Sequence, residues 1–153
     1  MKEFDYDLDY KELDFSDEEN RKLYRIGRGE QGVLLVRPYT NFICAHWRFK
    51  TPPEAIKSSN KIFSIYLDYR DAGDFIGMDM CRKFLEMGFT RSRRYANHHT
   101  GKKYDDKGNV TPQEPDHDTC KYAKSAQVFK KVRDIVAKSR DYVRMRKEWR
   151  SSE

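Results

Sequence analysis

Apolar residues recur at helical spacing in three long segments of the chain. In each segment they return every three or four positions, which gives a helix one apolar face. The segments are residues 53–71, 75–87 and 119–149. Thr51, Asp74 and Asp118 precede them, and short oxygen-bearing side chains of this kind cap helix N-termini. Gly88 stands where the second helix is expected to end.

The apolar pattern between residues 22 and 49 predicts a small antiparallel sheet. Val33–Val36 is a short apolar run between Gly32 and Pro38, as in a buried strand. The glycines before it have the spacing GxGxxG, which in phosphate-binding loops lets backbone N–H groups approach the ligand. No helix follows at once and the other protein-kinase motifs are missing, so we interpret them as a hairpin turn. The expected architecture is α+β, a small antiparallel sheet packed by three main helices in a single domain, residues 20–153.

Residues 1–19 are expected to form an acidic arm that precedes this domain. Aromatic and apolar side chains alternate with aspartates from Phe4 to Tyr10, but aspartate is unfavourable in strands. We therefore expect an extended arm that lays its aromatic side along the body, with disorder as the alternative. A further hypothesis makes the arm a docking segment for a protein partner.

The charge is divided unevenly between the arm and the body. The net charge of the chain is +6, whereas nine acidic residues and two lysines give residues 1–19 a charge of −7, which leaves +13 for the rest. A basic body favours phosphate-bearing partners such as nucleic acids, with a solvated charged surface as the alternative. Three cysteines without CxxC spacing, and no apolar run long enough for a signal or a membrane span, predict a soluble cytoplasmic protein without membrane contact.

The densest basic segment follows Gly88 and predicts the binding site. Residues 90–99 are expected to form a further short helix that begins at Thr90, where free N–H groups and guanidinium groups together favour a phosphate. Interleaved tyrosines are typical of platforms on which bases stack. The predicted contacts to a nucleic acid or another phosphorylated anion are Arg91, Arg93, Arg94, Tyr95, His98, Lys102, Lys103 and Tyr104, with Arg82 and Lys83 nearby.

Carboxylates at three-residue steps support an alternative, enzymatic hypothesis. If Asp68, Asp71 and Asp74 converge on Mg²⁺, with a histidine as base, the chain is a phosphodiesterase or a nucleotide-processing enzyme. An ordinary network of ion pairs with the arginines is the competing interpretation. The catalytic candidates are Asp71, Asp74, His98 and His99.

The sequence does not predict a zinc centre. Four ligands could come from His98, His99, His117 and Cys120 only if the intervening loop folds back on itself. We therefore expect no metal site, and no cofactor beyond the Mg²⁺ of the enzymatic alternative.

Two long segments resemble a family of uncharacterised proteins of bacteria and tailed phages, including cyanophages. They read GRGEQGVLLVRPYTNFICAHWRFKTPPEAIKSS and IYLDYRDAGDFIGMDMCRKFLEMGFTRSRRYANHHTGKKY. The likeness extends from about residue 4 to residue 143. It implies a bacterial or phage-infected cell as the setting, and it brings no activity from which catalytic residues would follow.

Overall fold

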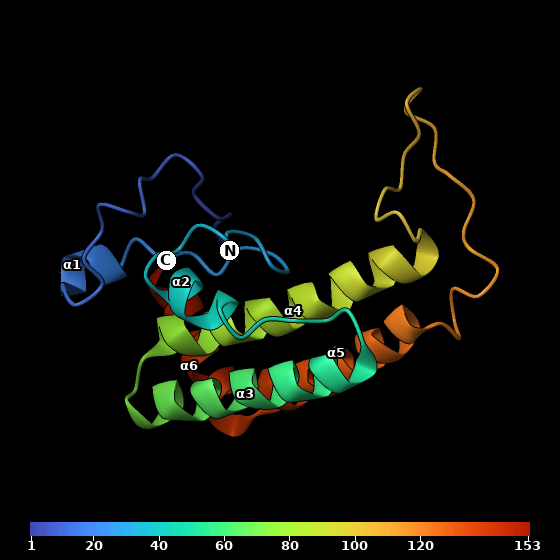
Figure 1. Cartoon of the computed structure of the whole chain (residues 1–153). Coiled ribbons are helices and arrows are strands. Elements are labelled where there is room, and N and C mark those ends of the chain that lie inside the picture. Colours follow the sequence, from blue (N-terminus) through green and yellow to red (C-terminus); the bar gives the residue numbers. More distant parts are fainter.

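The computed structural model describes residues 1–153 and contains helices without any sheet (Figure 1). In chain order the helices are α1 (Glu18–Arg21), α2 (Tyr39–Cys44), α3 (Pro52–Asp71), α4 (Phe75–Asn97), α5 (Lys121–Lys138) and α6 (Arg140–Ser152). The three long helices α3, α4 and α5 pack lengthwise against one another. The predicted α+β architecture with an antiparallel sheet is therefore wrong, and the fold is all-helical.

The apolar run that was expected to be a strand folds as a series of turns. Val33 and Val36 are buried, whereas Leu34 and Leu35 between them are 45% and 42% exposed. Burial thus repeats every third residue and not every second, as a strand would require. The N–H of Leu35 donates to the carbonyl of Gly32 at 2.9 Å, which is a bond within a turn. This N–H is therefore not free to pair with a neighbouring strand.

The glycine-rich segment reverses direction several times, which removes the second predicted strand as well. Gly27, Gly29 and Gly32 all have positive φ, between 53° and 78°, so the backbone cannot extend here. The segment that follows forms α2. A Cβ at Gly32 would overlap the ring of Phe4, so this loop closes over the chain's own arm and not over a phosphate.

The predicted starts of α3 and α4 are confirmed by their caps. The side chain of Thr51 accepts from the N–H of Glu54 at 3.3 Å, and that of Asp74 accepts from the N–H of Gly77 at 3.1 Å. The predicted end at Gly88 is wrong, because α4 continues to Asn97.

Gly88 is a packing residue inside a continuous helix. A Cβ at this position would overlap the buried ring of Phe129, so the missing side chain lets α4 and α5 approach closely. Thr90 accordingly lies within α4 and begins no helix of its own. The segment with the predicted anion-binding arginines is therefore the C-terminal half of the same long helix.

Gly88→Ala is expected to lower the free energy of unfolding. Overpacking against Phe129 costs about 1–3 kcal/mol, and the higher helix propensity of alanine returns at most about 1 kcal/mol. Urea unfolding followed by circular dichroism measures the difference. Ser64→Ala at an exposed position of α3 is the control. Equal or greater stability of the Gly88 variant would contradict the close packing.

The predicted last helix is divided in two. The chain breaks at Ser139, whose extended backbone separates α5 from α6. Cys120, and not Asp118, occupies the N-cap position of α5. The turn at Ser139 brings α6 back beneath the N-terminal part of the molecule, where the indole N–H of Trp149 donates to the carbonyl of Tyr24 at 3.0 Å.

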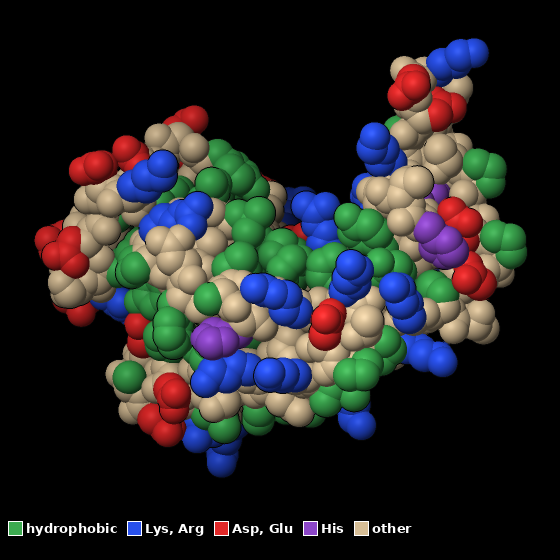
Figure 2. Space-filling model, viewed as in Figure 1, with side chains coloured by type: hydrophobic (Ala, Val, Ile, Leu, Met, Phe, Trp, Pro, Cys, Tyr) green, Lys and Arg blue, Asp and Glu red, His purple; other side chains and the backbone are tan.

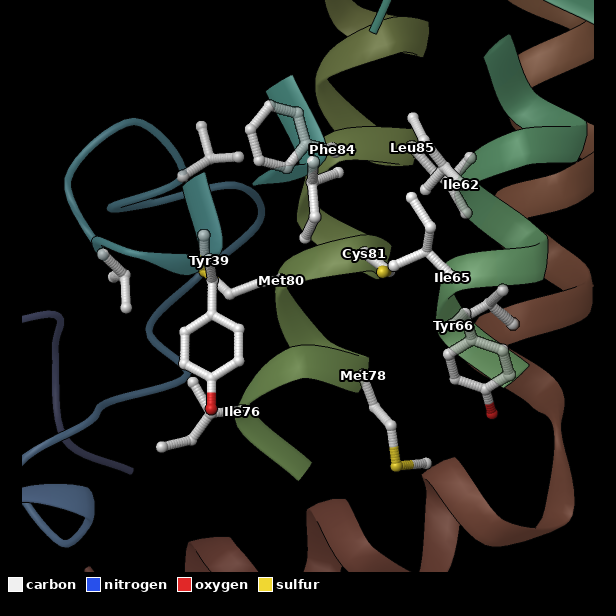
Figure 3. Packing of buried hydrophobic residues seen from close by; sticks show 14 of the residues in the cluster. Tyr39, Ile62, Ile65, Tyr66, Ile76, Met78, Met80, Cys81, Phe84 and Leu85 are labelled. Carbon is white, nitrogen blue, oxygen red and sulfur yellow. The ribbon is translucent and has the colours of Figure 1, made fainter. Parts of the chain in front are cut away.

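The core lies between α3, α4 and the segments that cover them. Figure 3 shows Ile62 and Ile65 of α3 directed toward Cys81 and Leu85 of α4. The acidic arm contributes Phe4, Tyr10 and Phe15, which are all buried, whereas Tyr6 is 58% exposed. The arm therefore lies against the body through part of its aromatic series. No helix combines the length and the apolar composition needed to cross a membrane.

Candidate anion-binding site

The C-terminal half of α4 presents one polar face to a loop that rises beside it. Arg93 and Arg94 each lie three or four residues from both Thr90 and Asn97, so the four residues share this face. The loop, residues 98–113, is called the projecting loop below (Figure 1). It closes at the antiparallel bridge between residues 104 and 110, and just beyond it the N–H of Glu114 donates to the carbonyl of Asn97 at 2.9 Å.

A groove of about 500 Å³ separates this face of α4 from the projecting loop, and we call it the basic groove. Its lining residues are Phe89, Thr90, Arg93, Arg94, Asn97, His98, Lys103, Val110, Thr111 and Gln113. Three of them are cationic and none carries a carboxylate. Figure 2 shows lysine and arginine side chains on both sides of the hollow between the loop and the body.

Most of the positive charge in the basic groove is unpaired within the chain. Arg94 and Lys103 have no carboxylate oxygen within 4.0 Å. Arg93 donates to the side-chain oxygen of Asn97 at 2.7 Å and lies 3.7 Å from Asp118, a side chain that is 76% exposed. Water screens an ion pair this exposed, so Asp118 neutralises Arg93 only in part.

His98 lines the groove, and Tyr104 follows the lining residue Lys103 without lining it. His98 is buried, and its Nδ1 lies 2.8 Å from the hydroxyl of Thr111. This contact joins the end of α4 to the returning segment of the loop. Tyr104 is 54% exposed, with the ammonium group of Lys103 5.7 Å from its ring centre. His98 thus shapes the wall, and Tyr104 offers an open aromatic face beside a cation.

Besides Tyr104, three other predicted contacts are not among the lining residues of the groove. The ring of Tyr95 packs 5.3 Å from that of Tyr122 and 5.7 Å from that of Phe49, so it belongs to an aromatic cluster. Arg91 and Lys102 are exposed but do not line the groove. The structure therefore brings together Arg93, Arg94, His98 and Lys103, with Tyr104 next to them.

A second cleft, of about 560 Å³, was not predicted as a site. It is lined by Arg82, Ala137, Tyr142, Val143, Arg146, Lys147 and Arg150, again without a carboxylate. The basic last turns of the chain were visible in the sequence. Their meeting with Arg82 depends on the turn at Ser139, which sequence spacing does not reveal.

The floor of the second cleft rests on a buried carboxylate. Asp79 accepts from the hydroxyl of Tyr24, from Tyr142 at 2.7 Å and from Nε of Arg82 at 2.8 Å, with Nζ of Lys83 3.8 Å away. Burial by itself would raise the pKa of Asp79, but the Arg82 and Lys83 charges and these hydrogen bonds outweigh it and lower the pKa to about 2. Asp79 is thus a charged structural centre that fixes Arg82.

Lys83 is enclosed on the other side of the same centre. Its ammonium group donates to the carbonyl of Gln31 at 2.7 Å and lies 5.0 Å from the ring centre of Phe4 in the arm. Burial lowers the pKa of Lys83 to about 8, although the charge of Asp79 opposes this shift. Lys83 therefore belongs to the interior and does not contribute to a ligand surface.

The residues of the enzymatic hypothesis do not converge. Asp74 is occupied at the start of α4, where it accepts from Arg21 at 2.9 Å and from Tyr39 at 2.6 Å. Asp71 is exposed and pairs with its neighbour Arg70. His98 and His99 follow the other end of this 23-residue helix, about 35 Å away at 1.5 Å per residue. No single Mg²⁺ can be shared across that distance.

One comparison with known proteins gives a match. A family model described as a domain of unknown function, DUF4385, matches residues 5–152. No curated protein and no solved structure matches the chain.

Proposed function

This chain belongs to the DUF4385 family of unknown function, and we propose that it binds a nucleic acid or another phosphate-bearing polyanion. The observation that carries the proposal is the basic groove, which is lined by three cations and by no carboxylate. Guanidinium groups bind phosphate oxygens through paired N–H donors, and an ammonium group adds a point charge. Arg93, Arg94 and Lys103 are the proposed phosphate contacts.

The second cleft favours a polymer with several phosphates, and not a single phosphate, as the ligand. Arg82 and Arg93 lie on one face of α4, about 16 Å apart at 1.5 Å per residue. Between them, Arg133 of α5 is paired with both Glu86 and Asp134, so that stretch offers no unpaired cation. A chain of phosphates would therefore be held by the basic groove at one end of this face and by the exposed cations of α6 in the second cleft at the other.

The position of the acidic arm also favours this proposal. The acidic arm lies at the end of the molecule opposite the projecting loop (Figures 1 and 2), so it leaves the basic groove open. The hypothesis that the arm docks on a protein has less support, because Phe4, Tyr10 and Phe15 are already buried in the chain itself.

The proposed setting is the cytoplasm of a bacterial or phage-infected cell. Its support is the resemblance of two long segments to proteins of bacteria and tailed phages, together with three cysteines that are all free.

A salt series tests the proposal. Fluorescence anisotropy with labelled single-stranded DNA, single-stranded RNA and duplex DNA should show binding at low salt, with the logarithm of the affinity falling linearly with the logarithm of salt concentration. Polyphosphate should compete. Absence of affinity for all of these probes at low salt would rule the proposal out.

Tyr104→Ala is expected to weaken binding of single strands selectively. Stacking of one base on an aromatic ring contributes about 1–3 kcal/mol, whereas bases in a duplex are not free to stack on protein. Tyr104→Phe keeps the ring and should bind as the wild type does. Equal losses for single-stranded and duplex probes would show that Tyr104 does not stack on a base.

A further inference from the structure

Three side chains of different metal-binding types converge where the chain returns to α5. They are His99 just after α4, Asp116 in the connector and Cys120 at the N-cap of α5. Each offers one ligand atom, and these atoms all lie within 4.8 Å of one another. Nε2 of His99 is 3.0 Å from a carboxylate oxygen of Asp116. An imidazole nitrogen, a carboxylate oxygen and a sulfur at this spacing can surround one small cation.

Backbone hydrogen bonds hold the three residues in this arrangement. The N–H of Glu114 donates to the carbonyl of Asn97 at 2.9 Å, which ties the connector to the end of α4. The N–H of Cys120 donates to the carbonyl of Asp116 at 2.9 Å, which fixes the approach to α5. The connector thus folds back, as a zinc site requires, but it brings a different set of residues together.

A fourth residue supports the imidazole from its other side. An oxygen of Glu114 lies 3.7 Å from Nδ1 of His99, while the other carboxylate oxygen accepts from the backbone N–H of His99 at 3.3 Å. Histidines that bind metals commonly direct their second ring nitrogen at a carboxylate, which fixes the tautomer and makes the ligand more basic. At 3.7 Å, Glu114 makes no hydrogen bond to Nδ1 of His99, but its charge lies on that side of the ring, and Nε2 lies on the side of Asp116.

We propose that His99, Asp116 and Cys120 bind a Zn²⁺ ion. A mixed set of nitrogen, sulfur and oxygen ligands suits Zn²⁺, whereas Mg²⁺ and Ca²⁺ take oxygen ligands almost alone. The side chains of His99 and Asp116 are 42% and 50% exposed, so an ion can enter and water can complete a tetrahedral shell.

The other two residues of the sequence-based zinc set lie apart from this site. Nδ1 of His98 is held by Thr111, and Nδ1 of His117 faces Asp118 at 3.1 Å. Zn²⁺ at the proposed position would fasten both ends of the segment that contains the projecting loop. Any effect of Zn²⁺ on polyanion binding in the basic groove rests on the proposed function, whereas binding of the ion itself does not.

The experiment titrates metal-free, reduced full-length protein with Zn²⁺ in competition with a chromogenic indicator, and with Co²⁺ followed by absorption. One equivalent of either ion should bind, and Co²⁺ should give a sulfur-to-metal charge-transfer band. Cys120→Ser should remove that band. Glu114→Gln should weaken Zn²⁺ binding by about 10- to 100-fold, and His99→Ala or Asp116→Asn should weaken it further.

Cys44→Ser and His46→Ala are matched controls on and beside α2, and they should leave Zn²⁺ affinity and the cobalt band unchanged. Circular dichroism of each metal-free variant shows whether it is folded. Zn²⁺ binding below one equivalent by the wild type, or a cobalt band that survives Cys120→Ser, would overturn the proposal. Because no nucleic acid is added, this result is independent of the polyanion test.

Discussion

Replacing Asp79 with alanine is expected to lower the free energy of unfolding by about 3–5 kcal/mol, the range for breaking a buried ion pair by removing one partner. Asp79 is fully buried and accepts hydrogen bonds from Tyr24, Tyr142 and Arg82. Its loss leaves two buried hydroxyl groups without their acceptor and a buried Lys83 without its counter-charge. The segment around Tyr24, α4 and α6, which meet at this carboxylate, would lose their common anchor.

Urea unfolding measured by tryptophan fluorescence tests this expectation. Asp71→Ala is the matched control, since Asp71 is exposed and pairs only with its neighbour Arg70. That control should change stability by less than about 0.5 kcal/mol. A variant of Asp79 that lacks any cooperative transition meets the expectation, whereas a loss below about 1 kcal/mol would show that the buried cluster is not a structural centre.

The same carboxylate makes the free energy of unfolding depend on pH. The pKa of Asp79 is lowered in the folded protein from its ordinary value of 3.8 to about 2. The unfolded chain therefore binds the proton more readily, and the contribution of Asp79 to stability is complete above pH 3.8. That contribution is lost as the pH falls through about 2. In Asp79→Asn this acid-dependent contribution should be missing.

Neutralising the basic groove is expected to reduce affinity for a single-stranded oligonucleotide by about 100-fold. The variant carries Arg93→Gln, Arg94→Gln and Lys103→Gln, the three cations of the groove. An exposed ion contact contributes up to about 1 kcal/mol, and three of them together correspond to about two powers of ten. Fluorescence anisotropy at low salt measures the change.

A control variant separates the site from net charge. Lys57→Gln, Lys61→Gln and Arg70→Gln remove the same number of charges from exposed positions of α3. Diffuse attraction to a basic protein would weaken equally in both variants. A local site predicts that the α3 variant stays within a few-fold of the wild type. Equal losses would contradict binding in the basic groove.

The long helices could be predicted because their signals are local. Thr51 and Asp74 cap α3 and α4 through residues three positions away, and the apolar periodicity is complete within each segment. The end of α4 could not be predicted in this way. Whether Gly88 ends the helix or lies inside it depends on Phe129, which is far away in the sequence. A glycine that permits a close approach has the same local signature as one that caps.

The sheet was predicted from a signal that does not distinguish between structures. A four-residue apolar run suits a strand, a turn or a short helix. The positive φ of Gly27, Gly29 and Gly32 decides between them, and two of these glycines, Gly27 and Gly32, pack against Phe4 of the arm. The exposure of Leu34 and Leu35 is the visible consequence.

Sequence reasoning found part of the candidate site and missed the rest for one physical reason. Arg93 and Arg94 lie in the last turns of α4 and His98 follows directly, so their clustering was visible. Lys103 joins them because the projecting loop returns to Asn97. The second cleft and the meeting of Asp116 with His99 also depend on chain reversals, which charge and spacing do not encode.

The most direct test of the central claim is the salt slope of oligonucleotide binding by the wild type and by the triple groove variant. Each phosphate contact to a single strand contributes about 0.7 to the slope of log affinity against log salt, so losing three contacts should reduce its magnitude by about 2. The account predicts that reduction for Arg93, Arg94 and Lys103, and no comparable change for the α3 variant. Identical slopes for the wild type and the groove variant would contradict it.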